Sequence, residues 1–254
     1  MINQHPVVSR DEWIAARKQH LVKEKEFTRD RDRLSAERRA LPWVKVEKNY
    51  VFDRADGKAT LAELFNGRSQ LIVYHFMLSP TSDHICKGCS FFSDHVDAAR
   101  MHFEHNDLSF VAISRAEIDK IEFVKKRMGW RFKWVSSYGN NFNYDYGVSF
   151  TPEQIAKGEV DYNYGTTPYA DEDLPGISVF YKDEGGQIFH TYSTYARGGD
   201  ILLGAYNFLD LTPKGRNETN VKDWVRLHDE YDSVEGVEPC CHSAKQKDRI
   251  VDRI

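Results

Sequence analysis

Two cysteines separated by two residues, Cys86 and Cys89, are the side chains of this sequence best suited to carry chemistry. They follow a continuous apolar run at 71–77 and precede a segment, 90–105, whose apolar residues have helical spacing. A thiol in the first turn of a helix meets unpaired backbone N–H groups and the positive end of the helix dipole, which favour thiolate over thiol. Because the thiolate is the nucleophile of disulfide exchange, this placement predicts redox chemistry. The structural alternative is a pair of inert buried thiols.

Three neighbouring side chains are candidates to assist the pair. Lys87 adds a positive charge beside the thiols. His84 and His75 are candidates for a base or proton shuttle, because an unperturbed imidazole titrates near pH ~6.5. For each histidine alone, packing or simple solvation is the favoured interpretation.

The same atoms also suit a metal. Cys86 and Cys89, joined by His84 or His95, would offer soft ligands for copper(I) or zinc. No second Cys-x-x-Cys and no His-x-x-x-His completes such a site. The alternative function is therefore a metal- or small-molecule-binding module without turnover, and the principal prediction includes no cofactor.

A second group of chemically active residues lies near the carboxyl terminus, at Cys240, Cys241 and His242. A flexible linker of about ten residues spans on the order of 15–20 Å, so this tail has the reach to bring a thiol to a Cys86–Cys89 disulfide. It could equally complete a metal site with them. The plain alternative is two surface thiols.

An aromatic and Asn-rich segment, Tyr138 to Phe150, is a candidate pocket wall together with Tyr192, Tyr195 and Arg197. Phenols and amides orient small ligands, and a guanidinium holds a carboxylate or another anion. Ordinary loop packing explains the same residues.

Composition limits the partners and the compartment. The 254 residues are 41% hydrophobic with a formal net charge of −4, which gives no electrostatic reason to expect nucleic acid or an anionic membrane. No uncharged apolar run approaches the ~20 residues of a membrane span, and the first residues lack the pattern of a signal peptide. Four cysteines are too few for a disulfide scaffold. We therefore expect a cytoplasmic protein.

Residues 9–41 are predicted to form one long helix. Ser9 and Glu12 have the spacing of a capping box, and Pro42 ends the segment. Its apolar seam repeats every seven residues at Trp13, His20, Phe27, Leu34 and Leu41. A helix with so narrow an apolar seam either packs on its own domain or pairs with the same helix of a second copy in a homodimer.

Strands and helices alternate through the rest of the chain, which predicts βαβ units with parallel strand pairing. Sites in such sheets lie at the carboxyl ends of the strands, where the Cys-x-x-Cys begins its helix. The expected elements are a hairpin turning at Asp56-Gly57, strands at 70–77, 108–114 and within 130–135, helices at 90–105 and 116–128, a hairpin over 177–192, a helix from Asp200 to Leu209 and a last amphipathic helix at 220–231.

This order of elements resembles the thioredoxin-like superfamily. Several runs look more specifically like a family of thioredoxin-fold proteins catalogued as a domain of unknown function, and the similarity covers about residues 9–231. The runs are Val111 to Ala116, Arg127 to Trp130, Trp134 to Gly139 and Phe189 to Gly198. The resemblance implies an α/β thioredoxin-like fold with a central mixed sheet. We expect a helical extension at 1–42, the thioredoxin-like domain at 43–212, and a C-terminal helix and tail at 213–254.

The resemblance also implies roles for individual residues. Cys86 matches the nucleophilic cysteine, Cys89 the resolving cysteine, and Pro175 the proline whose cis peptide faces the dithiol. The proline and threonine that precede a peroxiredoxin cysteine are absent before both residues, which disfavours that peroxidase chemistry. The predicted activity is therefore that of a thiol–disulfide oxidoreductase acting on a thiol or disulfide substrate.

Overall fold

The computed structural model describes residues 5–169 and 171–231, and the chain divides into two units between Trp43 and Val44. The first unit contains α1 (Arg10–Arg39). Its predicted capping box is present, since the Ser9 hydroxyl accepts from the Glu12 N–H at 3.3 Å and the Glu12 carboxylate accepts from the Ser9 N–H at 2.9 Å. None of the residues of α1 is buried. The homodimer through this helix stays a prediction.

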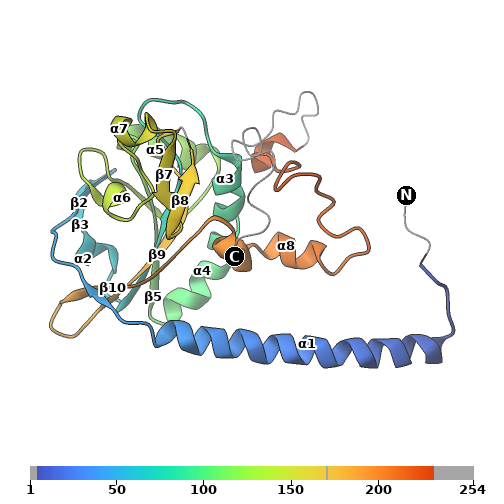
Figure 1. Ribbon diagram of the computed structural model, residues 1–254. Helices are drawn as coiled ribbons and strands as arrows, with labels where there is room; N and C mark the ends of the chain where they lie inside the picture. The colour runs from blue at the N-terminus through green and yellow to red at the C-terminus, as the bar shows by residue number, and fades with distance from the viewer. Residues whose placement is uncertain (1–4, 170, 232–254) are drawn as a thin grey trace. The chain divides into compact units, whose positions relative to one another are not determined.

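The second unit is built on an eight-stranded mixed sheet in the order β1-β10-β9-β4-β5-β6-β2-β3 (Figure 1). Three central strands, β4, β5 and β6, are parallel; β9 pairs antiparallel with β4, and β10 pairs antiparallel with β9. The strands are β1 (Val44–Lys45), β2 (Val51–Arg54), β3 (Gly57–Thr60), β4 (Gln70–His75), β5 (Leu108–Ser114), β6 (Lys133–Ser136), β9 (Gly176–Lys182) and β10 (Ile188–Tyr195). The predicted βαβ unit, which contains β4 and β5, and the predicted hairpin over 177–192, which is β9 and β10, are thus neighbours in one sheet.

Short helices and one further hairpin connect these strands. The helices are α2 (Leu61–Leu64), α3 (Lys87–Ser93), α4 (Val96–His105), α5 (Ile118–Arg127), α6 (Phe142–Asp145), α7 (Pro152–Ile155) and α8 (Gly204–Leu209), with 3₁₀ helices at Ala196–Leu202 and His228–Glu230. The hairpin pairs β7 (Glu159–Tyr162) with β8 (Gly165–Pro168). No helix of the described residues has the length and apolar character needed to cross a membrane.

Side chains that alternate in direction along each strand give the sheet two apolar faces. The side chains of Tyr74 and Ile177 pack in the same core cluster as Cys86 and Cys89, and we call this side the dithiol face. Leu71, Val73, Val111 and Phe180 pack in a second cluster on the other side, which we call the opposite face. Successive residues of a strand point to opposite faces, so neighbouring residues of β4 serve different sites.

The helix predicted at 90–105 is wrong in detail. The segment 90–105 is not one helix but two, α3 and α4, separated at Asp94 and His95. The His95 ring nitrogen Nδ1 lies 2.7 Å from the Phe91 carbonyl oxygen, and the Trp130 indole donates to the Asp94 carboxylate at 2.8 Å. These side-chain bonds hold the break between the helices.

The amphipathic α-helix expected at 220–231 is absent, and the segment forms turns followed by one 3₁₀ turn. The Asp223 carboxylate accepts from the N–H groups of Thr219 and Asn220 at 3.0 and 2.9 Å, and Lys222 has a positive φ of 62°. Such local bonds compete with helical ones. Asp200 likewise lies inside a 3₁₀ helix and does not cap α8.

Candidate functional site

The Cys-x-x-Cys begins a helix, as predicted. Cys86 is the N-cap of α3, and its Sγ accepts from the Cys89 N–H at a donor–acceptor distance of 3.3 Å. The N–H and the hydroxyl of Ser90 both donate to the Cys86 carbonyl, at 2.9 and 3.0 Å. A backbone donor aimed at sulfur stabilises negative charge on it. The two thiols therefore share one helical turn that favours a thiolate at Cys86.

Both cysteines are covered by protein. Each has 1% of its surface exposed, and the Met77 N–H donates to the Cys89 Sγ at 3.5 Å. The ring of Tyr74 stacks on Phe92, and its hydroxyl is hydrogen-bonded to Cys89. Burial raises the pKa of Tyr74 well above its usual value, and the nearby Cys89 sulfur raises it further. A substrate therefore reaches either sulfur only after local opening of the surrounding side chains.

Pro175 lies at the start of β9, but its predicted cis peptide bond is wrong. None of the peptide bonds of the described residues is cis. The Pro175 carbonyl accepts from the Tyr162 hydroxyl at 2.5 Å. At the next residue, Gly176, an added Cβ would lie 2.8 Å from Tyr195 and 2.9 Å from Val148. Close packing of aromatic side chains thus fixes this loop.

His84 and Lys87, two of the three side chains predicted to assist the dithiol, have different surroundings. His84 is exposed in the loop before Cys86, with its backbone N–H bonded to the Ser82 hydroxyl at 3.2 Å. Lys87 is the first residue of α3 and is half-buried. Their assisting roles stay predictions. His75, the other candidate base, lies on β4 directly before the turn to the dithiol, but its ring stacks on Phe142 of the opposite face.

The metal alternative finds little support among the described residues. No three of their His, Cys, Asp and Glu side chains gather as a metal site. Both ring nitrogens of His95 are already used, Nδ1 toward the Phe91 carbonyl and Nε2 as acceptor of the Ala205 N–H at 3.0 Å. His95 is therefore unsuited as a ligand in this arrangement. Cys240, Cys241 and His242 lie outside the described residues, so a site that includes them stays a prediction.

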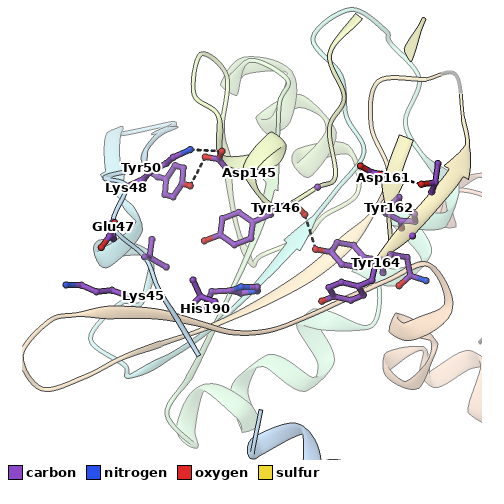
Figure 2. A pocket seen from close by; sticks show the side chains of 17 residues that line it. Lys45, Glu47, Lys48, Tyr50, Asp145, Tyr146, Asp161, Tyr162, Tyr164 and His190 are labelled. Carbon is purple, nitrogen blue, oxygen red and sulfur yellow. Dashed lines mark hydrogen bonds and ion pairs between the residues drawn. The ribbon is translucent and has the colours of Figure 1, made fainter. Parts of the chain in front are cut away.

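A groove of about 820 Å³ opens beside the sheet edge formed by β1 and β10, and Figure 2 shows its side chains. Five of the residues that line it are tyrosines: Tyr50, Tyr146, Tyr162, Tyr164 and Tyr195. The predicted pocket segment contributes Asp145, Tyr146 and Gly147, and Tyr195 also lines the groove. Arg197, expected to hold an anion, instead donates to the Asp200 carboxylate at 3.2 Å and is not among the lining residues. Tyr138 and Tyr192 are not among them either.

His190, which lines this groove from β10, was not among the predicted site residues. Tyr50, Tyr162 and Tyr164 were not among them either, and Tyr50 lies far from the other two in the chain. The only sequence signal for His190 was a polar residue within a strand of otherwise apolar and hydroxyl-bearing residues. That signal does not indicate which face the side chain takes.

Comparison with solved structures finds distant similarities. A cysteine-to-serine mutant of Xanthomonas campestris peroxiredoxin Q is 15% identical over 62% of this chain and 90% of its own, with a TM-score of 0.41. The peroxidoxin BcpB of Mycobacterium tuberculosis is 12% identical over 65% and 94%, with a TM-score of 0.43. A putative thiol:disulfide interchange protein DsbE of Chlorobium tepidum is 10% identical over 64% and 93%, with a TM-score of 0.38. A search of curated proteins finds no match.

The fold itself confirms the resemblance inferred from the sequence. A parallel β4–β5 pair joined through the Cys-x-x-Cys helix, followed by the antiparallel β9–β10 hairpin beside β4, is a thioredoxin-like arrangement. A family model matches residues 2–231, nearly the whole described chain. The chain therefore belongs to the family described as bacterial proteins of unknown function (DUF899).

Proposed function

We propose that this protein is a thiol–disulfide oxidoreductase that uses the Cys86–Cys89 dithiol. The observation that carries the proposal is the N-cap geometry, in which the Cys86 sulfur accepts the N–H of Cys89 within the first turn of α3. In this proposal Cys86 is the nucleophile and Cys89 the resolving thiol, and both belong to the start of α3. The covered position of both sulfurs protects the dithiol from unselective oxidation.

The reaction we propose has two steps. The Cys86 thiolate attacks a substrate disulfide, which forms a mixed disulfide with Cys86 and releases one substrate thiolate. The Cys89 thiolate, formed by loss of its proton to solvent, then attacks the Cys86 sulfur, which closes the Cys86–Cys89 disulfide and releases the second substrate thiolate. The protein dithiol loses two electrons and the substrate disulfide gains two. A thiol reductant reverses both steps.

The proposal includes a protein or a small-molecule thiol or disulfide as substrate, and a cytoplasmic location, where reductants return the dithiol to its reduced form. It includes no resident metal or other cofactor and no nucleic acid or membrane partner. The homodimer through α1 is a separate part of the same prediction.

The test is a redox titration of the full chain in glutathione buffers, with thiols counted after acid trapping. We expect one two-electron transition in the wild-type protein. The same transition should persist when Cys240 and Cys241 are both changed to Ser, and should vanish in Cys86→Ser and in Cys89→Ser. A transition that survives in Cys86→Ser would overturn the proposal.

Elemental analysis of the same samples separates the metal alternative. Stoichiometric zinc or copper that disappears in Cys86→Ser, in a protein without a two-electron transition, would favour a metal site. Thiol exchange predicts that the protein titrates without such metal.

Changing Tyr74 to Phe is expected to make the dithiol more reducing. The Tyr74 hydroxyl is hydrogen-bonded to Cys89, and we expect this bond to favour the reduced form over the disulfide. A hydrogen bond between neutral groups contributes ~0.5–1.5 kcal/mol. At ~30 mV per 1.4 kcal/mol for two electrons, we expect the midpoint potential to become about 10–30 mV more negative. Tyr138→Phe, at a half-exposed ring away from the dithiol, is the control and should leave the potential unchanged.

A further inference from the structure

The tyrosine-lined groove contains a histidine whose place depends on an irregularity of β10. The pairing of β10 with β9 shifts register between His190 and Tyr192. In a regular strand, residues three apart point to opposite faces. The extra residue of a bulge reverses that alternation, so His190 and Ser193 come together, with the His190 Nε2 2.7 Å from the Ser193 Oγ. Bulges that redirect a side chain in this way occur often beside functional sites.

A buried chain of hydrogen bonds extends from His190 across three strands. The Ser193 Oγ lies 2.9 Å from the Ser178 Oγ on β9, which lies 2.9 Å from the His75 Nε2 on β4. His75, Ser178 and Ser193 are all buried. A polar network of this kind inside a sheet is costly unless its members are satisfied, yet the His75 Nδ1 is buried without a hydrogen-bond partner in the described chain. Among the described residues, the His75 end of the network is therefore left with an unsatisfied buried nitrogen, which costs stability.

The bonds of His190 determine its tautomer. Its Nε2 also lies 3.1 Å from the Tyr192 carbonyl oxygen, which can only accept. The proton of the neutral ring is therefore on Nε2, and Nδ1 carries the lone pair. Burial lowers the pKa of His190, so the ring stays neutral at physiological pH. Within the described residues Nδ1 makes no hydrogen bond, which leaves an oriented acceptor on a residue that lines the groove.

Tyr146, which lines the same groove, offers a second polar group. The ring of Tyr146 meets that of His190 edge to face, with centroids 5.2 Å apart. Its hydroxyl has no hydrogen-bond partner within the part of the chain that the structure describes, and Figure 2 shows it pointing into the space between Tyr50 and His190. The other groove tyrosines use their hydroxyls internally: Tyr50 donates to Asp145 at 2.7 Å, and Tyr164 donates to the Ser193 carbonyl at 3.0 Å. One acceptor and one hydroxyl thus remain for a ligand.

The charges of the groove nearly cancel. Lys48 pairs with Asp145 at 2.6 Å, and Lys45 and Glu47 carry opposite charges on the same wall. The remaining acid, Asp161, accepts from the Thr166 hydroxyl at 3.1 Å. Such a lining has no excess of positive charge to hold a carboxylate or a phosphate, whereas its aromatic rings suit the faces and edges of another ring.

We propose that this groove binds a small, uncharged phenol-type ligand, whose hydroxyl donates to the Nδ1 of His190 and accepts from the hydroxyl of Tyr146. The Tyr192 carbonyl fixes the required tautomer, and the Ser193 hydroxyl, held by Ser178 and His75, orients the imidazole. His75 and Ser178 belong to the face of the sheet opposite the dithiol, so this site is independent of the proposed thiol exchange.

The experiment is a ligand-observed NMR titration of the full chain with three probes: p-cresol, toluene, which lacks the hydroxyl, and cyclohexanol, which lacks the aromatic ring. We expect saturable p-cresol binding, at least tenfold weaker binding of toluene, and weaker binding of cyclohexanol. A tenfold loss corresponds to one hydrogen bond left unmade in a desolvated site.

Two variants test the named atoms. His190→Phe keeps a ring and removes the acceptor, so p-cresol should bind about tenfold more weakly while toluene binding stays unchanged. Tyr146→Phe removes one hydroxyl that has no partner among the described residues, so the fold should be unaffected and p-cresol should bind severalfold more weakly. His102→Phe, at an exposed position of α4, is the matched control, and Cys86→Ser should leave p-cresol binding intact.

Three results would overturn the assignment: no saturable p-cresol binding up to millimolar concentration, p-cresol affinity unchanged in both His190→Phe and Tyr146→Phe, or cyclohexanol binding as tight as p-cresol. None of these would bear on thiol exchange, because the redox titration does not involve the groove.

Discussion

Acidification from pH 6.5 to pH 3 is expected to remove about 4 kcal/mol from the free energy of unfolding through His75 alone. Burial, with a smaller contribution from His190, lowers the pKa of His75 to about 3. In the unfolded chain an imidazole titrates near pH ~6.5. The fold favours the neutral ring, so His75 makes its full contribution to the free energy of unfolding above pH ~6.5. This contribution is lost as the pH falls toward about 3, because the unfolded chain binds a proton on His75 that the folded chain does not.

Urea unfolding between pH 7.5 and pH 5 checks this prediction. Few carboxylates titrate in that window, and the slope due to His75 approaches about 1.4 kcal/mol per pH unit below pH 6. His75→Gln keeps a donor and an acceptor near the Ser178 hydroxyl but does not titrate. Its unfolding free energy should therefore depend much less on pH than that of the wild-type protein.

The control is His84→Gln, an exposed position, which should retain the wild-type pH dependence. His190 is also half-buried with a lowered pKa and adds a loss of the same sign. For that reason the quantity to compare is the difference in slope between wild type and His75→Gln. Equal slopes in the two proteins would contradict the burial of a neutral His75.

The elements that the sequence predicted correctly are those decided by local pattern. The capping box at Ser9 and Glu12 fixes the start of α1. The apolar runs that became β4 and β5 are long enough to be buried strands, and the dithiol follows the first of them after a short loop at the start of a helix. Local signals of this kind do not depend on what packs against them.

The groove could not be predicted because it depends on contacts between distant segments. His190 reaches it through a bulge in β10, and alternation alone gives no warning of the shifted register. Tyr50, Tyr146 and Tyr162 come from three separate segments that meet only in the fold. The two helix errors have a related cause, since side-chain bonds of His95 and Asp223 to nearby backbone groups override the apolar spacing.

For His75 the structure contradicts the role expected from its place in the sequence. A histidine inside an apolar run was a sound candidate for special chemistry, and its proximity in sequence suggested a base for the dithiol. Strand alternation places its side chain on the face of Phe142, opposite that of Tyr74 and the dithiol. Its role as base for the dithiol is therefore replaced by membership of the network that ends at His190.

Arg115 follows β5 at the carboxyl edge of the sheet, and its loss is also expected to lower the free energy of unfolding strongly. Its guanidinium forms a two-pronged pair with Asp173, at 2.8 and 3.2 Å, and donates to Glu172 at 2.7 Å and to the Tyr144 hydroxyl at 2.8 Å. The side chains of Arg115 and Asp173 are only 13% and 9% exposed. The Asp173 carboxylate also accepts from Ser149 at 2.6 Å. This cluster ties the long connection before β9 to the sheet.

Arg115→Met is expected to lower the free energy of unfolding by ~3–5 kcal/mol, because it leaves the Asp173 carboxylate buried without its cation. Arg115→Lys keeps the charge but loses the planar fork, and should fall between Met and wild type. The matched control is Arg127→Met, which removes a two-pronged pair with Asp229 at 2.8 Å whose side chains are about a third exposed. We expect that change to cost at most ~1 kcal/mol.

Urea denaturation at pH 7.5 measures all three variants, and a double-mutant cycle identifies the source of the loss. If the cost arises from the uncompensated Asp173 charge, adding Asp173→Asn to Arg115→Met should recover part of the lost stability. Asp173→Asn alone should destabilise the protein, because it removes the charge that pairs with the largely buried Arg115 guanidinium. Equal costs for Arg115→Met and Arg127→Met would mean that the cluster behaves as an ordinary surface pair. Additive effects in the cycle would place the loss in packing, and the connection before β9 would then be held by its aromatic contacts instead of by charge.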